Sequence, residues 1–188
     1  MVTKITRIGV CGHRALPKRE AFKTALSKSS QLLKQYFPTS TFQVTSCLAE
    51  GADQLLAHHF LTSLSASLLG ILPLPLIEYK YDFSSSKGVS QLESLLSQSE
   101  RVLLPNPTIL RPLAYQTANL LLLENSDVLV AIWDGELVRG PGGTWEVVAI
   151  ARSLKLPLII ILIDPVTPSV RVITENFPPA LPTNRRPS

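Results

Sequence analysis

Four short segments of the chain combine glycine or proline with residues that can bind an anion or a sugar. They are "GHR" (residues 12–14), "CLAEGAD" (47–53), "PLPLIEYKYD" (73–82) and "WDGELVRGPGGT" (133–144). Each segment follows or ends an apolar run that is typical of a buried strand. Because ligands of open parallel sheets bind at the carboxyl ends of the strands, we expect the four segments to lie on one rim and to form one site.

The last of these segments predicts a phosphate-binding turn. Gly142 and Gly143 precede Thr144 at the expected start of a helix. Glycine lets an oxyanion come close to backbone N–H groups at a helix N-terminus, and the threonine hydroxyl adds a donor. A strand-to-helix turn also uses glycine for geometry alone, so both interpretations stay open.

The first segment displays two side chains at a strand end. Gly12 allows the backbone to turn sharply off the strand, which leaves His13 and Arg14 at the edge. The guanidinium of Arg14 suits a bidentate grip on phosphate or carboxylate. A surface role for Arg14 and a structural role for His13 are the alternatives.

The remaining segments supply candidates for the sugar and the base. Glu50 and Asp53 are able to accept hydrogen bonds from sugar hydroxyls or to cap the helix that Gly51 opens. Trp133, at a strand exit, is suited to stacking on a base, and core packing is its other interpretation. The full set of candidate ligand-binding residues is Gly12, His13, Arg14, Glu50, Gly51, Asp53, Pro73, Asp82, Trp133, Asp134, Gly135, Gly142, Gly143 and Thr144.

The elements that position these residues follow from an alternation of short apolar runs with helix-period segments. It predicts strands over residues 4–11, 41–46, 67–76, 101–105, 127–133 and 157–164, and helices over 22–36, 52–64, 89–96, 113–125 and 144–155. The first half of 78–100 is expected to be a loop. This pattern is typical of an α/β fold with a mainly parallel sheet.

Composition places the chain among globular proteins. Its 188 residues are 45% hydrophobic and 17% charged, which is far from a disordered profile. The longest apolar run, "LPLIIILI" (156–163), is too short to cross a bilayer. No targeting segment is evident at the start, so we expect a cytoplasmic protein, with Cys11 and Cys47 as reduced, buried thiols.

The formal net charge is +4, and many of the basic residues gather around the first helix. This favours anionic partners weakly, and a solvated helix face is the simpler interpretation. Nucleic acid is therefore a less favoured partner than a small anionic molecule.

Several common catalytic and cofactor motifs are missing from the sequence. It has no G-x-x-x-x-G-K-[ST] loop, no G-x-G-x-x-G fingerprint, no G-x-S-x-G elbow and no histidine pair at metal-ligand spacing. These absences argue against a P-loop NTPase, a common type of dehydrogenase, an α/β hydrolase and a zinc enzyme. No metal site is expected.

The ordered set "IGVCGHR", "CLAEGAD", "ILPLP" with "YDF", "DVLVAIWDG" and "GPGGTWEVV" resembles the SLOG superfamily over about residues 8–151. This superfamily includes the DNA-processing protein A domain, the Lonely Guy phosphoribohydrolases and sensor domains. The resemblance implies a single Rossmann-like domain over 1–164, with an open, mainly parallel sheet and helices on both faces. Residues 165–188 lack sustained periodicity and end polar and proline-rich, which predicts an edge strand or a flexible tail. The resemblance also implies a nucleotide or nucleotide-derived ligand, no other required cofactor and a homo-oligomer, which the leucine-rich segment 117–125 also favours.

Glu146 is the candidate catalytic residue, again by resemblance. Lonely Guy enzymes carry P-G-G-x-G-T-x-x-E, whereas this chain has "PGGTWEVV", in which the glutamate lies two positions after Thr144. A slip of one residue rotates a helical side chain by about 100 degrees, which puts hydrolysis in doubt. Whether the chain is an enzyme is therefore left open.

Three functions are consistent with the sequence. The first is a nucleotide-binding domain of the non-catalytic or sensor type. The second is a phosphoribohydrolase that cleaves the N-glycosidic bond of a nucleoside 5′-monophosphate. The third is single-stranded DNA binding, against which the low aromatic content of 6% argues.

Overall fold

The structure is a computed structural model of the 188-residue chain. It describes residues 4–17, 19–105, 110–136, 142–164, 167 and 169–177.

Seven strands form one open sheet in the order β4-β3-β2-β1-β5-β6-β7. All neighbours pair in parallel except β6 and β7, which are antiparallel. The bounds are Lys4–Gly12 (β1), Ser40–Ser46 (β2), Ser67–Ile71 (β3), Arg101–Leu103 (β4), Val128–Trp133 (β5), Leu158–Ile163 (β6) and Val170–Glu175 (β7). The predicted mainly parallel sheet is confirmed.

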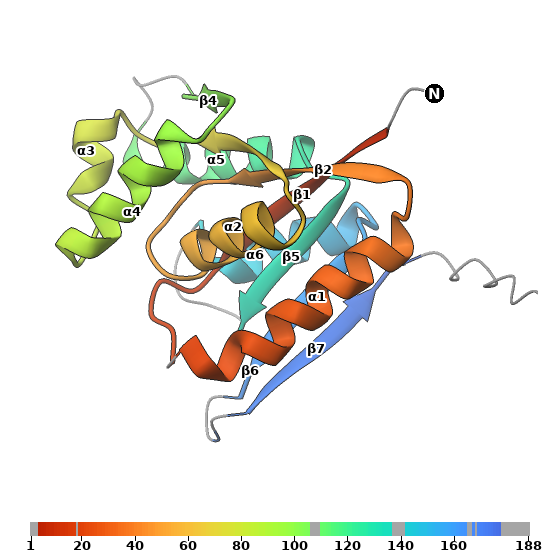
Figure 1. The fold of residues 1–188 in the computed structure, drawn as a ribbon. Coiled ribbons are helices and arrows are strands. Elements are labelled where there is room, and N and C mark those ends of the chain that lie inside the picture. The colour runs from red at the N-terminus through yellow and green to blue at the C-terminus, as the bar shows by residue number, and fades with distance from the viewer. Residues whose placement is uncertain are drawn as a thin grey trace, which may run out of the picture.

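Helices cover both faces of this sheet, as predicted (Figure 1). Helices α1 and α2 lie on one face, and α5 and α6 lie on the other. The bounds are Lys23–Tyr36 (α1), Ala52–Ser63 (α2), Leu76–Lys80 (α3), Ser86–Ser97 (α4), Arg111–Glu124 (α5) and Thr144–Ser153 (α6), with a 3-10 helix at Arg19–Phe22 before α1. The chain therefore has a Rossmann-like α/β fold.

Strand β5 shows why the sheet needs helices on both sides. Val128, Val130 and Ile132 belong to the apolar core under α1 and α2, whereas Leu129 and Ala131 belong to the core under α5 and α6. All five side chains are fully buried. Because alternate residues of a strand point to opposite faces, a strand buried on both faces must be apolar throughout.

The strand order places a crevice beside β1. The chain runs outward from β1 through β2, β3 and β4, and then returns to the other side of β1 as β5. Connections that leave β1 and β5 therefore go to opposite faces of the sheet. Ligands of open α/β sheets bind at such a switch point, at the carboxyl ends of the two strands.

Two local predictions were wrong. The strand expected over 67–76 ends at Ile71, and the residues expected to form a loop after it begin with helix α3, in which Tyr79 is fully buried. Its hydroxyl donates a hydrogen bond of 2.9 Å to the carbonyl oxygen of Cys47, which ties α3 to the end of β2.

At the other end of the chain, residues 170–175 form the antiparallel edge strand β7, and residues 178–188 of the expected tail lie outside the described part. Within the described ranges, no helix has the length and hydrophobicity needed to span a membrane.

Candidate functional site

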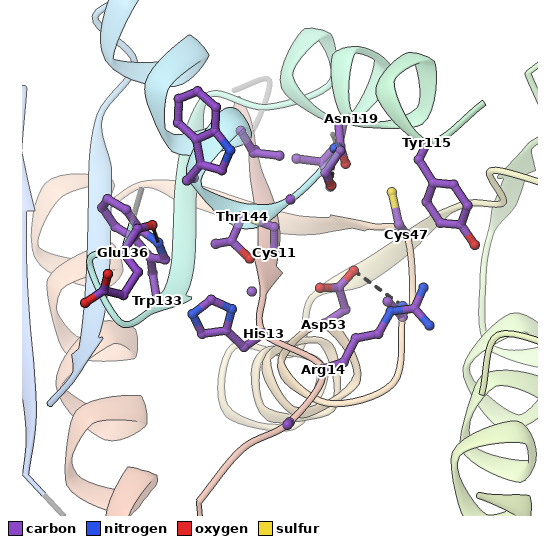
Figure 2. A pocket seen from close by; sticks show the side chains of 18 of the residues that line it. Cys11, His13, Arg14, Cys47, Asp53, Tyr115, Asn119, Trp133, Glu136 and Thr144 are labelled. Atoms are coloured by element: carbon purple, nitrogen blue, oxygen red, sulfur yellow. Dashed lines mark hydrogen bonds between the residues drawn. The ribbon is translucent and has the colours of Figure 1, made fainter. Parts of the chain in front are cut away.

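A pocket of about 410 Å³ lies at the carboxyl ends of β1 and β5, at the switch point of the sheet (Figure 2). Its lining comes from the ends of β1 and β5, the loops after β1, β2 and β5, the first turn of α2, and helices α3, α5 and α6. The sequence-predicted candidates that line it are Gly12, His13, Arg14, Asp53, Trp133, Gly142, Gly143 and Thr144.

The wall at α6 consists of the predicted glycine turn. Gly142 has a φ of 79°, in the left-handed region that favours glycine, and Gly143 is the N-cap residue of α6. Because Gly143 has no side chain, it cannot cap the first N–H groups of the helix. Asn119 on α5 holds the turn, since its Nδ2 donates a hydrogen bond of 3.0 Å to the carbonyl oxygen of Gly142. The turn thus presents helix N-terminal donors beside the pocket.

Glu146 is directed back to this turn. Its Oε2 accepts a hydrogen bond of 2.6 Å from the backbone N–H of Gly142, and its Oε1 accepts one of 3.2 Å from Nε2 of Gln116. Glu146 is not among the residues that line the pocket. Its carboxylate therefore joins the turn to α5.

His13 lines the pocket and is held by a carboxylate from the neighbouring strand end. Its Nε2 lies 2.9 Å from Oδ1 of Asp134, and the backbone N–H of Asp134 is 3.2 Å from the same nitrogen. The Asp134 side chain is 7% exposed and is not in the pocket lining. Asp134 thus holds the His13 ring in place at the edge of the pocket.

Arg14 lies between this pocket and a second hollow of about 450 Å³, because it lines both. Its Nη1 donates a hydrogen bond of 2.6 Å to the carbonyl oxygen of Asp82. The Asp82 carboxylate accepts hydrogen bonds from Arg111 and from the hydroxyl of Tyr115. Burial together with this carboxylate raises the pKa of Tyr115 to about 12, so the phenol is protonated. Asp82 therefore belongs to the second hollow.

Asp53 is the most deeply buried acidic group of the pocket. Its side chain, on the first turn of α2, is 4% exposed and points into the pocket between His13 and Arg14 (Figure 2). The backbone N–H of Ala49 donates to its Oδ2 at 3.4 Å. Burial raises the pKa of Asp53 to about 7, against the opposing effects of the Ala49 N–H and the Arg14 charge.

Glu50 and Gly51 shape the loop that carries Asp53. Glu50 accepts hydrogen bonds from the N–H and hydroxyl of Ser84 at 2.6 and 2.8 Å, and from the Ser85 hydroxyl at 2.5 Å. Although desolvation raises the pKa of Glu50, these hydrogen bonds and the charge of Arg14 lower it overall. Gly51 has a φ of 97°, and a Cβ there would lie 2.2 Å from the Arg14 carbonyl oxygen. Neither residue is in the pocket lining.

Two further candidates are not among the residues that line the pocket. Pro73 is buried in the connection between β3 and α3, and Gly135 has a φ of 84° in the turn after β5. Neither residue lines the pocket, so their positions support a role in shaping the backbone and not in binding a ligand.

Sequence reasoning missed several lining residues, and most of them come from α5 and from the strand ends. Tyr115, Asn119 and Leu122 share one face of α5 at spacings of four and three. That spacing is visible in the sequence, but it indicates a pocket only once α5 is known to cross beside β1. The other missed lining residues are Cys11, Ala15, Cys47, Ala49, Tyr79, Glu136, Trp145 and Val147.

The two cysteines contribute neutral thiols to the pocket wall. Burial raises the pKa of both Cys11 and Cys47 well above the ordinary value, with a further contribution from the Asp53 charge. Both thiols are free in the structure. Across the described part of the chain, no cluster of three or more histidine, cysteine, aspartate or glutamate residues is arranged to hold a metal ion.

Comparison of the chain with protein-family models and with curated proteins gives no match.

Proposed function

We propose that the chain binds a nucleotide or nucleotide-derived ligand in the pocket beside β1, as a SLOG-type domain of the non-catalytic or sensor kind. The observation that carries the proposal is the convergence of Arg14, Asp53 and Thr144 on one pocket at the switch point. These residues come from three strand-to-helix connections that are far apart in the sequence. Each offers a hydrogen-bonding group of a kind that a nucleotide needs.

The phosphate is assigned to the turn at residues 142–144. Three features support this assignment. Gly142 has a left-handed backbone conformation, the N-cap residue Gly143 has no side chain, and Thr144 provides a hydroxyl at the first position of α6. An anion gains from helix N-terminal N–H groups and from the helix dipole together. Arg14, which lines the same pocket, adds a full positive charge.

The dimensions of the pocket suit a ligand of this class. Pockets for small molecules and cofactors enclose roughly 300–1,000 Å³, and this one encloses about 410 Å³. Trp133 and Trp145 line the same space and provide aromatic surface. The proposal requires no cofactor besides this ligand.

Hydrolysis of an N-glycosidic bond remains the alternative, and the position of Glu146 favours binding without it. A catalytic carboxylate must reach the reacting atoms, whereas that of Glu146 is hydrogen-bonded to Gly142 and Gln116 outside the pocket lining. Single-stranded DNA binding is the less favoured alternative, because aromatic residues, on which bases would stack, make up only 6% of the chain.

Thermal unfolding with a panel of nucleoside mono-, di- and triphosphates tests the proposal. Ligand at about 100 times its dissociation constant stabilises by about 2.7 kcal/mol, which raises the midpoint of a domain of this size by roughly 5–10 °C. We expect a selective shift that is lost in Arg14→Ala and Thr144→Ala. The matched control is Thr117→Ala, since the Thr117 hydroxyl bonds only its own helix, to the Leu113 carbonyl. A panel without any shift in well-folded protein would contradict the proposal.

A further inference from the structure

The Asp53 carboxyl group is buried in the pocket and has hydrogen-bonding capacity that the protein leaves unused on the pocket side. A carboxylate offers about four acceptor positions. The interactions at Asp53 come from backbone groups of Ala49, Gly12 and Asp53 itself. Among the described residues, no side chain donates a hydrogen bond to it. Three donors against about four acceptor positions leave room for one more donor, and Asp53 lines the pocket from which it can come.

The surroundings of Asp53 select what that partner is. The charged and titratable groups that face it are Arg14 and His13 from the loop after β1, Cys11 from β1, Cys47 from the end of β2 and Tyr79 from α3. The His13 ring is paired with Asp134. The two thiols and the phenol are neutral, because burial raises their pKa values. Arg14 is exposed and lies toward the second hollow, so it does not neutralise the acid by contact.

In a nucleotide the sugar is bonded to the phosphate. A phosphate on the turn at 142–144 therefore places the sugar in the pocket that Asp53 also lines. Neutral hydroxyl donors satisfy a carboxylate without the cost of desolvating a second charge. We propose that Asp53 accepts a hydrogen bond from the 2′-hydroxyl group of a ribose, and that it makes the pocket selective for ribonucleotides over 2′-deoxyribonucleotides. This inference rests on the proposed nucleotide-binding function and assigns the substrate class of the same site.

The same arrangement makes the selectivity depend on pH. The ionised carboxylate accepts from the 2′-hydroxyl, whereas its protonated form has lost part of its acceptor capacity. Asp53 titrates near neutrality because of its burial, with a pKa of about 7. The preference for ribose is therefore full at pH 8 and falls as the pH drops to 6.

Titration calorimetry with matched pairs of nucleoside and 2′-deoxynucleoside 5′-monophosphates tests the inference. At pH 8 we expect wild-type protein to bind the ribose form tighter by about tenfold or more, the usual range for hydrogen bonds to a charged group. Asp53→Asn should bind both forms with the same, weaker affinity. Glu93→Gln is the control, because Glu93 lies exposed on α4 and pairs with Lys80.

The design separates this inference from the function on which it rests. Equal affinity of the wild type for the two sugars, or an undiminished preference in Asp53→Asn, overturns the role of Asp53 and leaves nucleotide binding in place. A preference among bases with none between sugars also overturns it. Failure of every nucleotide to bind overturns the proposed function and this inference together.

The pH dependence of the preference for ribose is measured on wild-type protein alone. The ratio of the two affinities in wild-type protein cancels the titration of the phosphate itself, because both ligands carry the same phosphate. A ratio that stays constant between pH 6 and pH 8 contradicts the inference even if Asp53→Asn fails to fold.

Discussion

The side chain of Glu146 closes the turn that precedes its own helix: its Oε2 lies 2.6 Å from the backbone nitrogen of Gly142. Its other oxygen, Oε1, accepts from Gln116 on α5 at 3.2 Å. One carboxylate thus fixes the glycine turn of α6 against the neighbouring helix. The residue for which the resemblance implies catalysis is hydrogen-bonded to the turn and to α5 in this geometry.

Removal of this carboxylate should loosen the turn. We expect Glu146→Ala to lower the free energy of unfolding by about 1 kcal/mol, in the range of a lost helix cap. Glu146→Gln keeps one amide oxygen as an acceptor and should lose less. Urea denaturation of the three proteins measures both differences. A fully stable Glu146→Ala protein would show that the contact with Gly142 is not stabilising.

Gly51 should tolerate no side chain, because its backbone lies against the loop after β1. A Cβ at this position would meet the Arg14 carbonyl oxygen at 2.2 Å, in addition to the strain of a φ of 97°. We expect Gly51→Ala to cost at least about 2 kcal/mol of stability. Gly135→Ala is the matched control: its φ is 84°, but the nearest atom to a new Cβ is 3.5 Å away. It should cost about 1 kcal/mol. Equal losses in the two variants would contradict the close approach at Gly51.

The sheet, its two covered faces and the segments on its rim were predictable from the sequence, because apolar runs such as Val128–Trp133 leave little choice of environment. The contribution of α5 was not. Tyr115 and Asn119 reach the pocket because β5 lies next to β1. The order of the strands in a sheet cannot be predicted from the local periodicity of the sequence. Of the segment 73–82, Tyr79 lines the pocket, whereas the candidates Pro73 and Asp82 do not. Burial of Tyr79 in α3 directs Asp82 to the second hollow.

Asp53 should make the protein less stable at alkaline pH. Burial raises its pKa from 3.8 to about 7, so between these values the folded protein keeps a proton that the unfolded chain has released. Stability therefore falls as the pH rises through this window and is constant with respect to this group above it. We expect Asp53→Asn to be more stable than wild type at pH 8, on the order of 2–4 kcal/mol. The difference should disappear near pH 4. Denaturation curves at pH 4, 6 and 8 measure it, and a less stable variant at pH 8 would contradict the raised pKa.

Self-association remains a prediction, and the outer face of α5 is where we expect it. Leu113 and Leu120, seven residues apart on this helix, are 49% and 47% exposed. Light scattering should give a mass above the 20.6 kDa of one chain, and Leu113→Glu with Leu120→Glu should reduce it to that value. Leu154→Glu, at a position 63% exposed beyond α6, is the control. A monomeric wild-type protein would remove this expectation.

Tryptophan fluorescence tests the central claim most directly, because the two tryptophans of the chain, Trp133 and Trp145, both line the pocket. Wild-type protein is titrated with nucleoside 5′-monophosphates and, in parallel, with the same nucleosides without phosphate. We predict a saturable change in emission with the phosphorylated ligand at lower concentration than with the nucleoside, and a loss of this advantage in Thr144→Ala. An emission spectrum that no nucleotide changes, or that nucleosides change equally well at the same concentrations, would contradict a nucleotide site with its phosphate on the turn before α6.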